Sequence, residues 1–159
     1  HLSIRRQRQM CIRDSRNRLR LRQLSEGREV INCFSYTGAF SVYALAGGAR
    51  SVLSIDSSGE AMALAVENMA LNDFDCSRIE WLEADVFHAL RSLRDQGRTC
   101  DLVVLDPPKF APTAAQAERA ARGYKDINLL AFKLLRPGGL LFTFSCSGGI
   151  STDLSLIHI

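Results

Sequence analysis

Residues 30–40 read VINCFSYTGAF, an apolar run followed by a polar turn at Gly38. The run over 30–34 has the length of one buried strand, and small and apolar residues after the glycine continue at helical spacing to about Ala46. Two glycines at 47–48 then end the predicted helix. A strand, a glycine-containing turn and a helix in this order form the first half of a βαβ unit.

The same alternation of apolar runs and helical patterns continues along the chain. Further strands are predicted over residues 51–55, 79–82, 101–105 and 140–144. Further helices are predicted over residues 59–71 and 86–97, from about 115, and over 126–135. Ser57 or Ser58 can cap the second helix. Right-handed crossovers then give a doubly wound, mostly parallel α/β sheet, with its ligand crevice at the carboxyl ends of the strands.

Polar residues follow the predicted strands at the positions where this crevice lies. The turn over 35–38 follows the first strand, and Asp56, Asp85, Asp106 and Cys146 follow the other four. Accessible backbone N–H groups in the turn and a carboxylate after the second strand suit a nucleoside cofactor, because the carboxylate can accept both ribose hydroxyls. In the alternative interpretation, the glycine serves only the geometry of the turn and Asp56 only caps a helix.

The turn also discriminates between classes of cofactor. Gly38 and Asp56 are 18 residues apart, which is near the spacing of roughly 20 in dinucleotide-binding folds. However, the sequence FSYTGAF over 34–40 lacks the G-x-G-x-x-G pattern that lets a backbone approach a pyrophosphate. A nucleoside cofactor without a pyrophosphate therefore fits better than NAD.

The tetrapeptide Asp106-Pro107-Pro108-Lys109 follows the fourth predicted strand. Two prolines end the strand and stiffen the loop, because proline has no N–H for the ladder. A rigid loop positions a carboxylate well at the mouth of a crevice. The alternative is a rigid strand exit without a chemical role.

Five segments together resemble the catalytic domain of the ribosomal RNA large subunit methyltransferase I family. They are NCFSYTGAF (32–40), SIDSS (54–58), LDPPKF (105–110), RGYKDIN (122–128) and FTFSCSG (142–148). The resemblance covers nearly all of residues 16–153, and its last two segments are far more specific than a lone glycine turn. It implies a Rossmann-like class I methyltransferase that uses S-adenosylmethionine to methylate C5 of cytosine in large-subunit ribosomal RNA.

The resemblance also implies roles for individual residues. The implied cofactor contacts are Phe34, Ser35, Tyr36, Gly38, Asp56, Ser57, Asp85, Val86 and Asp106. The turn residues surround the methionine end of the cofactor, Asp56 binds the ribose, and Asp85 lies near the adenine amino group. Asp106 and Lys109 face the target base, and Cys146 is the nucleophile.

A cysteine suits this chemistry, because C5 of cytosine becomes nucleophilic only after a group adds to C6, and a thiolate adds well there. A base must then remove the proton from C5, and Lys109 and a bound water are both candidates. The target base must also be unstacked to reach the crevice, where Tyr124 or Phe110 could supply a stacking face. Either aromatic residue could equally belong to the core.

Three alternatives remain open. If Cys146 is only a buried structural thiol, the same fold methylates an exocyclic nitrogen or a small molecule, because an acid followed by two prolines can also hold an amino group. A non-catalytic RNA-binding module is expected to have a basic surface. An NAD oxidoreductase is expected to have the missing glycine pattern.

Composition sets outer bounds on the class of protein. The chain has 159 residues, of which 47% are apolar and 23% charged, as expected for a single globular domain. Its five cysteines show no C-x-x-C spacing, so we expect reduced thiols without a disulfide framework or a metal site. The sequence contains no run of about 18 apolar residues and no signal-peptide pattern. We therefore expect a cytoplasmic protein without a membrane partner.

Both ends of the chain resemble foreign sequence. Residues 5–15 resemble an in-frame translation of a transposon sequencing adapter, and residues 154–159 resemble a translation of its complementary strand. We therefore expect residues 1–15 and 154–159 to be non-native, and residues 16–153 to be a catalytic-domain fragment truncated after its fifth strand, with weak or no activity. The formal net charge of +3 then falls to zero, so overall charge does not support RNA binding.

Overall fold

The computed structural model describes residues 15–72, 74–108 and 117–144, except for the side chains of 117–119. Strands and helices alternate along the chain as the sequence predicts. The elements are a helical segment over residues 15–23, β1 (Glu29–Cys33), α2 (Ala39–Ala46), β2 (Ser51–Asp56), α3 (Gly59–Ala70), the short 3₁₀ helix η1 (Cys76–Arg78), β3 (Ile79–Glu83), α4 (Val86–Asp95), β4 (Cys100–Leu105), α5 (Ala117–Leu134) and β5 (Leu135–Thr143).

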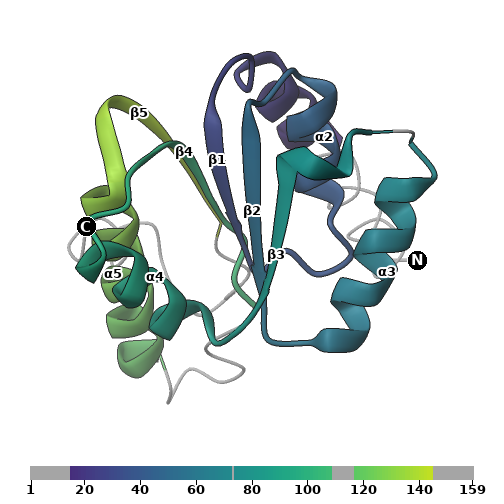
Figure 1. Cartoon of the computed structure of the whole chain (residues 1–159). Helices are drawn as coiled ribbons and strands as arrows, with labels where there is room; N and C mark the ends of the chain where they lie inside the picture. Colours follow the sequence, from purple (N-terminus) through teal and green to yellow (C-terminus); the bar gives the residue numbers. More distant parts are fainter. Residues whose placement is uncertain (1–14, 73, 109–116, 145–159) are drawn as a thin grey trace, which may run out of the picture.

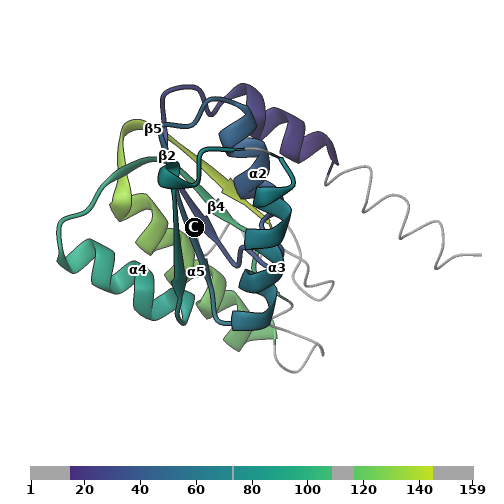
Figure 2. The same cartoon turned by 45° about the vertical axis from the view of Figure 1, so that its right-hand side comes forward.

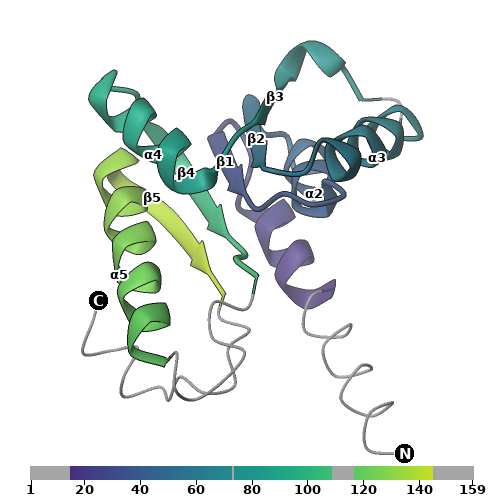
Figure 3. The same cartoon turned by 90° about the horizontal axis from the view of Figure 1, so that it is seen from below.

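The five strands form one sheet in the order β3-β2-β1-β4-β5, and every neighbouring pair is parallel. Cys33, at the end of β1, pairs with Ile55 on one side and with Leu105 on the other. The strands therefore end at one edge of the sheet. β2 and β3 run downward in Figure 1 into the loops before α3 and α4, and Figure 3 views the molecule from below, toward this edge.

Helices cover both faces of the sheet, so the predicted doubly wound α/β arrangement is confirmed. In Figure 1, α4 and α5 lie on one side of the sheet and α2 and α3 on the other, and Figure 2 shows the helix over 15–23 beside α2. Alternate residues of β1 face the two cores, because side chains alternate along a strand. Ile31 packs in the core under α4 and α5, whereas Val30 packs with Leu21 of the helix over 15–23.

The region after the fourth strand differs from the prediction. Two helices were predicted there, but α5 is one continuous helix from 117 to 134. β5 begins at Leu135, earlier than predicted, although the pairing with β4 is irregular between Leu135 and Leu140. Within the described ranges, no helix is both long enough and apolar enough to cross a membrane.

Candidate active site

The turn that follows β1 has an unusual backbone. Phe34, Tyr36 and Gly38 have φ angles of 56°, 47° and 77°, so every second residue from 34 to 38 lies in the left-handed region. This conformation costs a residue other than glycine about 1–2 kcal/mol. Glycine adopts this conformation without such a cost, but only one of the three left-handed residues is a glycine.

The carboxylate of Asp56, at the end of β2, holds this turn in place. One of its oxygens accepts a hydrogen bond from the N–H of Tyr36 at 2.8 Å, and the other accepts one from the N–H of Ser58 at 2.9 Å. The N–H of Ser35 donates to the carbonyl of Ile55 at 3.1 Å. Because an ionised carboxylate has about four acceptor positions, Asp56 retains the capacity to bind the hydroxyls of a ligand.

Gly38 lies directly before α2 and packs closely against α3. A Cβ atom at this position would lie 2.9 Å from Cβ of Ala65 and 3.4 Å from Cη2 of Trp81. Asn68, also on α3, donates from Nδ2 to the carbonyl of Thr37 at 3.0 Å. Glycine at position 38 thus allows both the left-handed turn and the close approach of α3.

Asp85 follows β3 and caps α4. Its Oδ1 accepts a hydrogen bond from the N–H of His88 at 2.9 Å, and this bond uses one of its two carboxylate oxygens. The neighbouring Val86 is only 2% exposed, and its side chain packs in the core. Val86 therefore offers a ligand almost no accessible surface. Ser57 is exposed next to Asp56.

Asp106 is half-buried directly after β4, and Pro107 behind it is buried. The pairing of Cys33 with Leu105 places Asp106 beside the turn that follows β1. The structure therefore brings the turn, Asp56, Asp85 and Asp106 to one edge of the sheet. The predicted residues Lys109 and Cys146 lie outside the described residues, as does Phe110.

Two buried polar atoms near this edge have no hydrogen-bond partner within the described structure: Oγ of Ser35 and Oδ1 of Asn32. Leaving such an atom unsatisfied costs about 1–3 kcal/mol. The unsatisfied hydroxyl of Ser35, the remaining acceptor capacity of Asp56 and the exposed Asp85 provide the donor and acceptor groups that a cofactor with ribose hydroxyls and an amino-substituted base requires. These residues fit a nucleoside cofactor.

A buried polar cluster that was not predicted from the sequence lies next to the turn. Nδ2 of Asn32 donates to Oγ of Ser41 at 2.8 Å, and the hydroxyls of Ser41 and Ser54 lie 2.6 Å apart. The cluster joins β1, α2 and β2, and so fixes the elements on both sides of the turn. A polar residue at position 32, inside an otherwise apolar strand, was the available signal for it.

The cysteines that the structure describes differ in accessibility. Burial raises the pKa of the Cys33 thiol far above its usual range, and burial raises that of Cys100 to about 12. Neither thiol forms a thiolate readily, so neither is suited to act as a nucleophile. Cys76 is exposed, but it precedes β3, away from the carboxyl edge. In the described part of the chain, no group of His, Cys, Asp or Glu could hold a metal ion.

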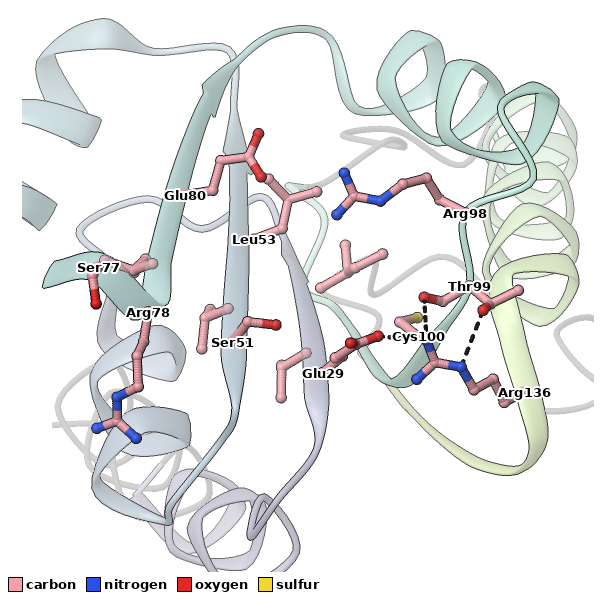
Figure 4. A pocket seen from close by; sticks show the side chains of 14 residues that line it. Glu29, Ser51, Leu53, Ser77, Arg78, Glu80, Arg98, Thr99, Cys100 and Arg136 are labelled. Carbon is pink, nitrogen blue, oxygen red and sulfur yellow. Dashed lines mark hydrogen bonds and ion pairs between the residues drawn. The ribbon is translucent and has the colours of Figure 1, made fainter. Parts of the chain in front are cut away.

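A cavity of about 370 Å³ lies at the opposite, amino-terminal end of the strands. It is lined by the first residues of β1 to β4, and Figure 4 shows Glu80 and Arg98 extending toward it from opposite sides. Arg136, at its rim, donates to Oδ1 of Asp101 at 2.8 Å and also pairs with Glu29. None of the predicted site residues lines this cavity, so we place the candidate active site at the carboxyl edge instead.

The parallel sheet order and the carboxylates at its carboxyl edge define a Rossmann-like α/β protein. The model of a family described as S-adenosylmethionine-dependent methyltransferase matches residues 3–158. The chain therefore belongs to the S-adenosylmethionine-dependent methyltransferase family, and the cofactor of this family is S-adenosylmethionine.

Individual proteins that are similar to this chain include named ribosomal RNA methyltransferases. The chain is 54% identical over 142 residues to the ribosomal RNA large subunit methyltransferase I of Cronobacter sakazakii, covering 89% of this chain and 35% of that relative. It is 52% identical to the protein of the same name from Yersinia pseudotuberculosis, with the same coverage. A solved methyltransferase structure complexed with S-adenosylhomocysteine superposes with a TM-score of 0.81 at 26% identity, covering 91% of this chain and 38% of that one. The chain thus spans about a third of the length of these curated relatives.

Proposed function

We propose that this chain contains the cofactor-binding and catalytic portion of a methyltransferase that acts on cytosine C5 in large-subunit ribosomal RNA. The supporting observation is the high sequence identity to relatives named as ribosomal RNA large subunit methyltransferase I. The DPPK and FSCSG segments support the choice of cytosine C5, because they provide an acid on a rigid loop and a cysteine at neighbouring strand ends. The rest of the longer relatives lies outside this proposal.

In this proposal, the residues at the carboxyl edge hold the cofactor along three strand ends. Asp56 accepts the ribose hydroxyls with the lone pairs that its two backbone hydrogen bonds leave available. Asp85 accepts a hydrogen bond from the adenine amino group with the carboxylate oxygen that does not cap α4. The turn over 34–38 surrounds the methionine end. Bound S-adenosylmethionine supplies an electrophilic methyl group and leaves as S-adenosylhomocysteine.

Cys146, Asp106 and Lys109 would act on the base. The thiolate of Cys146 adds to C6, and the electron pair displaced from the C5–C6 bond makes C5 the nucleophile that takes the methyl group. Asp106 in its protonated form donates a hydrogen bond to N3 as charge develops there, and its other oxygen accepts one from the amino group of the ring. Lys109 or a water then removes the proton from C5, the C5–C6 double bond re-forms, and the thiolate leaves.

A trapping experiment tests this chemistry. The protein expressed from the complete gene is purified and incubated with S-adenosylmethionine and RNA that carries 5-fluorocytidine. Fluorine at C5 cannot be removed as a proton is, so the protein remains covalently bound at C6. We expect a band of protein joined to RNA in a denaturing gel, and its loss in Cys146→Ala.

The controls distinguish methylation at cytosine C5 from methylation of the exocyclic nitrogen. Cys76→Ala, which removes an exposed thiol away from the site, should give as much adduct as the wild type. An adduct that persists in Cys146→Ala would assign the nucleophile elsewhere. No adduct in any variant, together with N4-methylcytidine in digested product RNA, would replace C5 methylation with methylation of the exocyclic nitrogen.

A further inference from the structure

Tyr36 combines two features that seldom occur together. Its backbone is left-handed, with φ of 47°, a conformation that bulky side chains rarely adopt. Tyr36 is also 68% exposed, the largest exposure among the aromatic residues that the structure describes as exposed. The ring therefore gains little from packing that would compensate for the strain of its backbone. Strain of this kind, at the edge of a site, points to a functional reason for the side chain.

The surroundings of Tyr36 show how the strained backbone is maintained. Its N–H donates to the carboxylate of Asp56 at 2.8 Å, and the N–H of Gly38 donates to the carbonyl of Ser35 at 2.8 Å. These bonds involve only the backbone of the turn, so a glycine at position 36 could make all of them. The tyrosine ring is not needed to build the turn.

The strand order places Tyr36 between two groups of residues with different proposed roles. Asp56 and Asp85 follow β2 and β3, on one side of β1, whereas Asp106 follows β4, on the other side. In the proposed function, the nucleoside of the cofactor lies on the first side and the acceptor base on the second. Tyr36 is therefore located where the two ligands meet.

We infer that Tyr36 provides the stacking face for the acceptor base. This inference rests on the proposed function, in which the acceptor is an RNA base. A base taken out of its stack loses the contacts of its neighbours, and an exposed aromatic ring replaces them. Tyr124, a candidate from the sequence, is only half-exposed on α5, where its carbonyl accepts a hydrogen bond from Nδ2 of Asn128 at 2.7 Å.

The first test measures stability. Tyr36→Gly removes the ring and permits a left-handed backbone without strain. We therefore expect this variant to unfold at a higher urea concentration than the wild type, with Tyr36→Asn between the two, because asparagine tolerates the left-handed region better than tyrosine. A lower midpoint for Tyr36→Gly would show that packing within the protein retains the ring, and would overturn the inference.

The second test measures the interaction between the ring and a base. Two short RNA probes are compared: a backbone of abasic nucleotides, and the same backbone with one cytosine. Each is titrated into wild type, Tyr36→Phe and Tyr36→Gly in the presence of S-adenosylhomocysteine. Stacking of one base contributes a factor of about ten or more to affinity, so Tyr36→Gly should bind the cytosine probe about tenfold more weakly and the abasic probe equally well. Tyr36→Phe, which keeps the ring, should behave like the wild type.

The outcomes separate this inference from the proposed function. Equal effects of Tyr36→Gly on both probes would overturn the stacking role, even if the 5-fluorocytidine adduct forms with Cys146. Weaker binding of S-adenosylhomocysteine by Tyr36→Gly, with no difference between the probes, would assign the ring to the cofactor instead. Failure of the adduct experiment alone would change the proposed chemistry at C5 but not the stacking of the base.

Discussion

Charged side chains at the two ends of the sheet have different partners. At the amino-terminal end, Arg136 binds Asp101 and Glu29, so side chains of opposite charge pair with one another. Asp101 also accepts the N–H of Glu29, whereas at the carboxyl-terminal end all the hydrogen bonds that the described residues give to the carboxylates of Asp56 and Asp85 come from backbone N–H groups. The first arrangement neutralises charge within the protein. The second leaves negative charge and acceptor positions that a ligand can use.

The two ends of the sheet also differ in backbone conformation. The left-handed residues Phe34 and Tyr36 both belong to the carboxyl edge, and no other residue except glycine has a positive φ in the described part of the chain. Strain is thus concentrated at the end where the carboxylates retain acceptor capacity. This combination indicates that the carboxyl edge is built for binding, while the amino-terminal end serves the fold.

The largest expected effect comes from removing the carboxylate that links the turn to β2. Asp56→Ala removes the acceptor of the proposed ribose hydrogen bonds and frees the N–H of Tyr36. Hydrogen bonds to a charged group contribute about 1.5–3 kcal/mol each, so we expect S-adenosylmethionine to bind at least about 100-fold more weakly in isothermal titration calorimetry.

Asp101→Ala is the matched control at the other end of the sheet. It removes a carboxylate of the same type, which accepts the N–H of Glu29 at 2.8 Å, but it lies far from the proposed cofactor. Its affinity for S-adenosylmethionine should stay within about twofold of the wild type, because distant sites act independently. Equal losses in both variants would show that the two ends do not differ in function.

A smaller effect is expected from alanine at two glycines with similar backbones. Gly38 and Gly97 have φ of 77° and 69°, but a Cβ at Gly38 would collide with Ala65 while one at Gly97 meets nothing within 4 Å. The left-handed conformation costs alanine about 1–2 kcal/mol, and overpacking adds about 1–3 kcal/mol. Urea unfolding should therefore show a loss of about 3 kcal/mol for Gly38→Ala and about half of that for Gly97→Ala. Equal losses of stability in the two variants would show that the close contact between Gly38 and α3 does not contribute to the effect.

Much of the sheet could be predicted from the sequence, because apolar runs and helical spacing are local signals. The cap of α3 is an example: Ser57 or Ser58 was expected, and Oγ of Ser58 accepts the N–H of Ala61 at 3.2 Å. α5 shows the limit of such signals. Gly123 lies in the middle of it and lowers local helix propensity, yet burial of Ala120 and Ile127 on either side keeps the helix continuous.

The details of the candidate site depend on contacts between residues distant in the sequence. Nothing local in Phe34 or Tyr36 indicates a left-handed backbone, because the bond that holds Tyr36 comes from a carboxylate 20 positions away. The pairing of Arg136 with Glu29 spans 107 positions. The sequence could therefore indicate which residues lie at the carboxyl edge, but not the strain of the turn or the partners of Asp56.

The smallest expected effect concerns pH and the amino-terminal end. The N–H of Glu29, followed by Arg136, lowers the pKa of Asp101 below its usual value. A carboxylate with a lowered folded-state pKa stabilises the protein above its unfolded-state pKa, which is about 3.9, and this contribution is lost as pH falls through the folded-state value. The stability difference between the wild type and Asp101→Asn should therefore be constant above about pH 5 and shrink below about pH 4.

Asp95→Asn, which changes an exposed carboxylate paired with its neighbour Arg94, is the control. If the stability difference between the wild type and Asp101→Asn stays constant down to acid unfolding, Asp101 is not selectively stabilised as a carboxylate. The charged residues at the amino-terminal end would then not stabilise the fold as described.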